Sequence, residues 1–394
     1  MGKRTFLREN FGYILAGIAI TSFLLFLYLY KLGSITGGLS ESELKIATLK
    51  VSFSHLLSDP LYLPLKLVRY VTFFIFSDHG QTLSRLPNII FGLLTAAAFA
   101  WCIWLWHGIR TCFLISLLFI TSAWVLHVSR TATFDVLYLW SIPTLLLLQA
   151  LIHEHKSNKI VWFFAISVWT LIAFVPGMIW LIIAQLIIKR RDFINYFQDI
   201  ESFGFKLLLG AIPLVGLSLL IFGILKDANL LLWLGIQTEN FNLIHNIKNL
   251  IGVPVHILMF GPLYPDIWLG HAPIFDAFTW LCAALGVYFY IRKFKATRAI
   301  TLFSFIIICT FLVGTLGLIA YSSLVALGYM IAAAGIAYLT YEWMKVFPRN
   351  PLARAVGITI IASLVCLACV YNLRSYYVAW PHNVDTLQHF NNKL

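Results

Sequence analysis

The chain has 394 residues, of which 60% are hydrophobic and only 11% are charged, and its mean hydropathy is +0.87. A soluble globular domain carries about a quarter charged residues, so this composition excludes a soluble protein and makes lipid the expected solvent. The net charge of +12 does not indicate nucleic-acid binding, because the basic residues stand in short clusters between apolar stretches and form no basic domain.

Apolar stretches long enough for membrane-spanning helices recur along the whole chain. Backbone amides in hydrocarbon must be satisfied within the segment, and these stretches are too long and continuous for barrel strands, so we expect helices. A Pro-Gly pair at 176–177 divides one long stretch in two. The predicted spans, about eleven, cover residues 11–30, 83–106, 111–127, 136–152, 160–175, 177–188, 205–224, 271–290, 298–311, 316–341 and 353–371.

The distribution of charge predicts the orientation in the membrane. Most Lys and Arg residues fall in short loops on the side of the N-terminus, at a higher density than in the longer segments of the other side. The positive-inside rule therefore predicts a cytoplasmic N-terminus, and an odd number of spans puts the C-terminus outside. Most Asp and Glu residues fall on the outer side, which the rule does not require and which suggests that the chemistry takes place there.

We expect a single transmembrane domain over residues 1–394 with three distinct outer segments. Residues 31–82 form the first outer loop, in which Leu61 to Phe76 mixes cations with apolar residues and is typical of a helix lying in the membrane interface. Residues 225–270 form a second outer loop, rich in Asn, His, Pro and aromatic residues, and residues 372–394 a short tail. No outer segment is long enough for a soluble catalytic domain.

The Cys and His residues do not indicate a metal centre. The six cysteines lie in or beside apolar spans, and Cys366 and Cys369 have no second ligand pair, so structural thiols are the better interpretation. His256 belongs to the second outer loop, where the spacing of His and Asp is too irregular for a zinc site. We predict no metal ligands and no cofactor, and leave dependence on a divalent metal open.

Two carboxylates open the first outer loop, just beyond the first span. Glu41 and Glu43 follow a glycine turn and Ser40, a residue that can cap a helix. A carboxylate at a membrane rim can act as a general base for a hydroxyl, because partial desolvation raises its pKa. The alternative is that either glutamate only stabilises a helix N-terminus.

Further polar residues lead from this loop into the second span. Asp59 and Tyr62 lie in a Ser-Asp-Pro-Leu-Tyr segment, and Lys66 and Arg69 follow. Arg85 enters the second span at its outer end, where an arginine either extends to the interface or binds an anion. The three cations are therefore candidates for binding a phosphate, with Asp59 and Tyr62 as further candidates for the site.

Arg130 and Asp135 lie five residues apart in a short outer turn between two apolar helices. A charged side chain at such a position costs free energy unless it pairs with another group or takes part in binding or catalysis. Arg130 can bind a phosphate through two hydrogen bonds or hold Asp135 in a structural pair, and both interpretations stay open. Three outer loops thus bring carboxylates, arginines and aromatic residues to one side, which suits the positioning of an anionic lipid headgroup beside an acceptor hydroxyl.

The order of these features resembles the GT-C superfamily of membrane glycosyltransferases, in particular the branch of protein O-mannosyltransferases and lipid A aminoarabinose transferases. The family usually has adjacent Asp-Glu in its first loop, and the alignment places Ser42 at the Asp and Glu43 at the Glu. The resemblance covers about residues 10–155, and beyond them only hydropathy agrees. The matching features are Glu41 to Glu43, Asp59-Pro60-Leu61-Tyr62, Arg85-Leu86-Pro87-Asn88-Ile89-Ile90-Phe91-Gly92-Leu93, and Ser129-Arg130 with Asp135.

The resemblance implies an all-α polytopic fold and an inverting transfer from a polyprenyl-phosphate sugar to a glycan, lipid or protein acceptor. It implies an acidic residue as base, here Glu43, Glu41 or Asp135, and we expect a multi-pass protein of a prokaryotic plasma membrane. The residues independently favour a lipid-linked donor, since there is no G-x-G-x-x-G before a helix and no nucleotide-binding domain. Positive charge, from Arg130, Arg85, Lys66 or Arg69, would stabilise the departing phosphate.

Two other classes of protein fit part of the pattern. A lipid flippase or transporter is also polytopic, but such proteins tend to show inverted repeats and charges near the midplane, whereas the charges here lie at the rim. A non-catalytic accessory protein with the same fold would have lost the base, and the Glu-Ser-Glu sequence leaves that possibility open. Membrane lipids are expected partners of all three classes, and nucleic acid of none.

Overall fold

The computed structural model describes residues 20–49, 52–76, 80–155, 158–200, 202–226, 229–237, 243–262 and 272–392. The first part of the predicted span 11–30, parts of the two outer loops and the end of the tail lie outside these ranges. Within them the chain is helical apart from turns and one isolated bridge between Leu39 and Asn392. The predicted all-α class is therefore confirmed.

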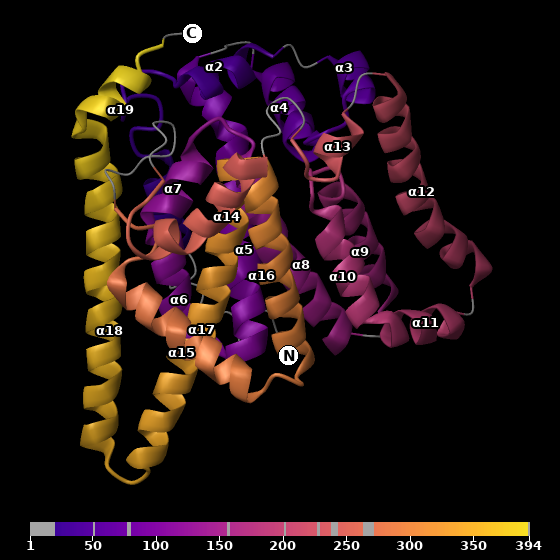
Figure 1. Ribbon diagram of the computed structural model, residues 1–394. Helices are drawn as coiled ribbons and strands as arrows, with labels where there is room; N and C mark the ends of the chain where they lie inside the picture. The colour runs from indigo at the N-terminus through magenta and orange to yellow at the C-terminus, as the bar shows by residue number, and fades with distance from the viewer. Residues whose placement is uncertain are drawn as a thin grey trace, which may run out of the picture.

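The helices before residue 200 are coloured from indigo to magenta in Figure 1. Ahead of α2, residues Ile20–Leu29 form the described part of the first helix. The others are α2 (Glu41–Thr48), α3 (Phe53–Ser58), α4 (Leu63–Ile75), α5 (Gln81–His107), α6 (Ile109–Thr121), α7 (Ala123–Arg130), α8 (Asp135–Glu154), α9 (Lys159–Ile172), α10 (Ile179–Ile188) and α11 (Arg190–Asp199).

The helices after residue 200 continue to the C-terminal tail. They are α12 (Phe203–Lys226), α13 (Leu230–Trp233), α14 (Leu243–Leu258), α15 (Ala277–Arg292), α16 (Thr297–Leu316), η1 (Gly317–Ala320), α17 (Tyr321–Val346), α18 (Pro351–Arg374), η2 (Ser375–Ala379), η3 (Trp380–His382) and α19 (Val384–His389).

Every predicted span overlaps an apolar helix of the described residues. Five helices are long and apolar enough to cross a membrane, or six if the bent pair α6 and α7 counts as one span. One of the five, Thr297–Val346, joins α16, η1 and α17 and so contains two predicted spans. The other predicted spans fall on four shorter apolar helices, which are Ile20–Leu29, α9, α10 and α15.

Local sequence explains where these helices break. Gly177 adopts a φ of 76° and separates α9 from α10 at the predicted Pro-Gly break, and its N–H donates to the carbonyl of Trp233 at 2.8 Å. Gly317, with a φ of 72°, ends α16 before η1. Both angles are ones that only glycine adopts at no steric cost. Helices α6 and α7 meet at Ser122 with a bend of 59°.

Helices α2, α3, α4 and α19 gather at one end of the bundle (Figure 1). Helix α4 is amphipathic, as predicted for this segment: it buries Leu65, Lys66 and Arg69 and exposes Val71 and Phe74. This division suits a helix that lies along the membrane interface with one face on the bundle. The end that carries these helices is the one predicted to face outward, and we call it the outer end.

Helices α15 and α17 approach so closely that only glycine fits between them. A Cβ at Gly286 would lie 1.9 Å from the carbonyl oxygen of Ile331, and one at Gly335 would lie 1.9 Å from that of Cys282. Small residues at helix crossings in membranes allow this backbone contact, which gains van der Waals packing where lipid provides no hydrophobic driving force.

Replacing Gly286 by Ala should therefore push the two helices apart and destabilise the protein by about 1–3 kcal/mol, the usual cost of overpacking. Gly210→Ala in α12 is the matched control, since a Cβ there meets nothing within 4 Å. Thermal unfolding of both variants in detergent measures the difference. Equal midpoints for the two variants would contradict the close packing.

Candidate functional site

Glu43 lies in the first turn of α2, directly after the residue that caps this helix. The hydroxyl of Ser40 accepts a hydrogen bond from the N–H of Glu43 at 3.2 Å, and the N–H of Ser40 donates to Glu43 Oε2 at 3.2 Å. These reciprocal bonds form a capping box, so Glu43 has the helix-stabilising role that the sequence offered as an alternative.

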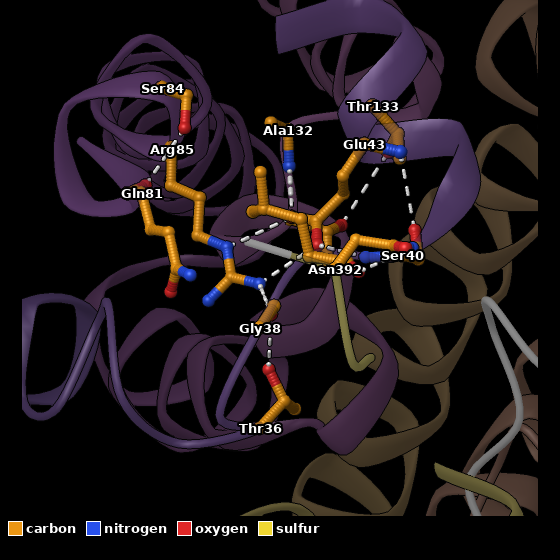
Figure 2. A network of polar contacts seen from close by, with 12 residues as sticks. Thr36, Gly38, Ser40, Glu43, Gln81, Ser84, Arg85, Ala132, Thr133 and Asn392 are labelled. Atoms are coloured by element: carbon orange, nitrogen blue, oxygen red, sulfur yellow. Dashed lines mark hydrogen bonds and ion pairs between the residues drawn. The ribbon is translucent and has the colours of Figure 1, made fainter. Parts of the chain in front are cut away.

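Arg85 approaches the same carboxylate from α5 (Figure 2). Its Nε donates to Glu43 Oε1 at 2.9 Å and its Nη2 to Oε2 at 2.8 Å, while the N–H of Ala132 donates to Oε1 at 2.8 Å. The guanidinium also donates to the carbonyls of Leu32 at 2.7 Å and Gly38 at 3.1 Å. Both charged side chains are buried, at 2% and 0% exposure for Arg85 and Glu43.

The carboxylate of Glu43 thus accepts two hydrogen bonds from Arg85, one from Ala132 and one from Ser40. A carboxylate offers about four acceptor positions, so this one is saturated by the protein. These bonds suit a side chain that positions the outer loop, and a catalytic role of Glu43 stays a prediction. Arg85 is likewise held by Glu43 and by backbone carbonyls, and it does not extend to the interface.

Glu41 lies in a different environment although it is only two residues away. Its side chain is 76% exposed and pairs with Lys45 at 2.8 Å. The hydrogen bond and the positive charge of Lys45 hold the pKa of Glu41 below its ordinary value. Glu41 has the features of a surface carboxylate that supports a short helix.

Arg130 is the last residue of α7, and its side chain contacts the C-terminal tail. Its Nη2 donates to the carbonyl of Tyr30, and its guanidinium carbon lies 5.3 Å from the ring centre of Tyr376 and 5.1 Å from that of Tyr377. Among the described residues its Nε and Nη1 have no hydrogen-bond partner. These contacts with aromatic faces are cation–π interactions, and the two interpretations that the sequence left open for Arg130 stay predictions.

Two buried cations lie on the inner face of α4. Lys66 Nζ is 2.6 Å from Asp59 Oδ2 and also donates to the carbonyl of Asp59 at 2.9 Å. Arg69, one turn later, is 2% exposed, and in the described part of the chain its Nε and Nη2 have no hydrogen-bond partner. Burial lowers the pKa of Lys66 against the opposing effect of Asp59, and burial lowers the pKa of Arg69 to about 10. A buried guanidinium with unpaired donors is suited to an anion.

Tyr62 connects these cations with Asp135. Its ring stacks on Phe134 at 4.1 Å between ring centres, and its backbone has a φ of 58°. Burial raises the pKa of Tyr62, the Tyr138 phenol opposes this shift, and the nearby carboxylates of Asp135 and Asp59 add to it. Asp135, at the start of α8, and the Asp59–Lys66 pair therefore act on the same phenol and belong to one cluster.

His256 makes contacts of another kind. Its Nδ1 lies 3.1 Å from the carbonyl oxygen of Phe260, and its ring centre lies 6.0 Å from that of Tyr321. These contacts do not connect it with the cations on α4, so its role in the site stays a prediction. In the described ranges no group of three or more His, Cys, Asp or Glu side chains is arranged to hold a metal ion.

Aromatic residues that the sequence did not assign to the site shape its walls. Phe134 supports Tyr62, and Tyr376 and Tyr377 face Arg130 from the π-helical turn η2. Phe134 stands beside Asp135 in the Arg-x4-Asp turn, which was the one available signal for it. No local pattern connects the two tail tyrosines with Arg130, because they lie far along the chain.

The chain shares its fold, a bundle of apolar helices with amphipathic helices at one end, with solved membrane proteins. Two crystal structures of ArnT from Cupriavidus metallidurans are similar to it. The apo form matches with a TM-score of 0.54 and 10% identity over 97% of this chain and 76% of that one. The form bound to undecaprenyl phosphate matches with a TM-score of 0.56 and 9% identity over 96% and 76%. No family model and no curated protein matches the sequence.

Replacing Glu43 by Gln should destabilise the protein by about 3–5 kcal/mol, since it leaves the buried charge of Arg85 without its partner. Glu41→Gln, at an exposed position two residues away, should change stability by less than about 1 kcal/mol. Thermal unfolding midpoints in detergent compare the two variants. A midpoint for Glu43→Gln equal to that of Glu41→Gln would show that the ion pair does not hold the outer end together.

Proposed function

We propose that the protein is an inverting glycosyltransferase that moves a sugar from a polyprenyl phosphate to an acceptor hydroxyl at the outer end of the bundle. The observation that supports it most is the buried guanidinium of Arg69, whose Nε and Nη2 have no hydrogen-bond partner among the described residues. It lies on α4 near Lys66, in a fold shared with a protein solved with undecaprenyl phosphate. The protein is a multi-pass membrane protein, and its predicted orientation puts this end outside, where nucleotide sugars are absent.

The two cations on α4 are proposed to bind the phosphate of the donor. They lie three residues apart on one face of the helix, so both can reach the same group. Burying a guanidinium without a partner is costly, and a phosphate would offset that cost with charge-assisted hydrogen bonds to Nε and Nη2 of Arg69. The exposed apolar side chains of the same helix, Val71 and Phe74 among them, leave the polyprenyl chain a route along the interface.

Asp135 is the proposed general base. Glu43 is saturated by hydrogen bonds and Glu41 is paired with Lys45 on the surface, so neither has the setting of a base. Asp135 is 5% exposed and shares the environment of Tyr62 with Asp59, beside the proposed phosphate site.

The proposed reaction is a single displacement. The carboxylate of Asp135 accepts the proton of the acceptor hydroxyl as that oxygen forms a bond to C1 of the sugar. The bond between C1 and the phosphate oxygen breaks on the opposite face, and its electrons pass to the polyprenyl phosphate, whose charge Arg69 and Lys66 stabilise. The anomeric configuration is inverted.

Asp135→Asn should lower the rate of transfer about 10²- to 10⁴-fold, which is what a general base contributes. Asp385→Asn, an exposed carboxylate in α19 at the same end, is the matched control and should keep the rate of the unchanged protein. The measurement is release of polyprenyl phosphate from labelled polyprenyl-phosphate sugars by purified protein. A rate for Asp135→Asn within twofold of the control would exclude this residue as the base.

Arg69→Gln should weaken binding of polyprenyl phosphate roughly tenfold or more, because a hydrogen bond to a charged group contributes about 1.5–3 kcal/mol. Arg374→Gln, an exposed arginine at the end of α18, is the control and should bind normally. The same titrations separate the rival classes of protein. Binding of polyprenyl phosphate without turnover of the sugar donor would contradict the proposed enzyme and favour an accessory protein. Movement of the lipid across liposome membranes would favour a flippase.

A further inference from the structure

The opposite end of the bundle holds two adjoining cavities that the proposed reaction does not use. They have volumes of about 500 and 700 Å³ and share His107, Phe289 and Lys293 as lining residues. They lie where α5, α8 and α15 end and α16 begins, away from α2 and α4 (Figure 1). By the predicted orientation this is the cytoplasmic end.

The charge around these cavities is strongly positive. Five cations stand against two carboxylates in their walls, and two histidines lie among them. One of the cations, Lys189, is paired with Asp192 at 3.1 Å. The cations are Arg110, Lys189, Arg292, Lys293 and Arg298, and the carboxylates are Glu154 and Glu342.

Buried polar groups without a partner line the smaller cavity. Tyr290 is only 3% exposed, and its hydroxyl has no hydrogen-bond partner among the described residues. The same is true of Nε2 of His107, which lies in the wall of both cavities. The positive-inside rule accounts for cations at this end, but it does not account for unpaired hydrogen-bonding groups buried beside them.

Arg298 is held in place at the opening. Its Nη1 donates to the carbonyl of Trp106 at 3.2 Å, and its guanidinium carbon lies 5.3 Å from the ring centre of the same residue. A guanidinium has five N–H donors, so this single bond leaves the others available to a ligand. Arg298 and Trp106 line the same cavity as Tyr290 and His107.

We propose that these cavities bind a phosphate-bearing anion, with Arg298, Lys293 and the hydroxyl of Tyr290 as its ligands. An anionic phospholipid headgroup is the source that the surroundings favour. Exposed apolar residues stand next to lining residues in the chain, Ile109, Ile291 and Phe294 among them, and they suit acyl chains attached to the bound phosphate. The site is separate from the proposed transferase site, so either assignment can fail without the other.

The test uses full-length protein in phosphatidylcholine nanodiscs, with phosphatidylglycerol and inorganic pyrophosphate as the two probes. Binding is measured for the unchanged protein, Arg298→Gln, Tyr290→Phe and the control Arg349→Gln, which alters an exposed arginine in the turn before α18. Tyr290→Phe removes only a hydroxyl with no described protein partner, so it leaves the packing of α15 intact.

The unchanged protein and Arg349→Gln should bind phosphatidylglycerol saturably, and Arg298→Gln and Tyr290→Phe should weaken that binding about tenfold, the effect of losing one hydrogen bond to a charged group. The same dependence on Arg298 and Tyr290 with pyrophosphate alone would support the phosphate site and assign it to a soluble anion. Equal affinities of all four proteins for both probes would overturn the proposal.

Discussion

The buried ion pair between Glu43 and Arg85 is the constraint on which the outer end of the bundle depends. Removing each charge from water costs several kcal/mol, and mutual attraction offsets that cost only where the remaining donors and acceptors are satisfied. Here backbone groups of Ser40, Leu32 and Ala132 supply those bonds. Since these residues belong to the first loop, the end of the first helix and the turn after α7, two side chains fix three segments against α5.

The two glutamates of α2 have different environments in this arrangement. Successive helical residues are separated by about 100°, so two glutamates spaced as Glu41 and Glu43 point to nearly opposite sides of α2. Only Glu43 reaches Arg85, and Glu41 stays on the surface with Lys45. The ion pair holds the loop while both glutamates are occupied by partners within the protein, which is why Asp135 is the carboxylate proposed as the base.

Hydropathy alone predicts the apolar helices, because solvation by lipid acts on each segment separately, and Pro176-Gly177 predicts a break for local steric reasons. It does not predict their length, since five or six of the described helices are long enough to cross a membrane where about eleven spans are expected. The sequence also brings the candidate site residues of the first three outer loops to one end. It does not predict their pairing: Glu43 and Arg85 are 42 residues apart, and Arg130 meets tyrosines of the tail. These contacts depend on packing between helices that are distant in the chain. Such packing produces no periodic pattern in the sequence.

The cations at the two ends of the bundle have different surroundings, and this affects which ligands each end can bind. At the outer end Arg85 is neutralised by a carboxylate of the chain, whereas Arg69 and Arg130 keep buried donors without a described hydrogen-bond partner. Arg130 also faces two tyrosine rings, and Arg69 lies one turn from Lys66, where a single phosphate is proposed to bind. At the opposite end the cations surround open cavities of several hundred Å³ with few carboxylates. A larger anion that exchanges with the membrane fits that end better than a substrate held for reaction.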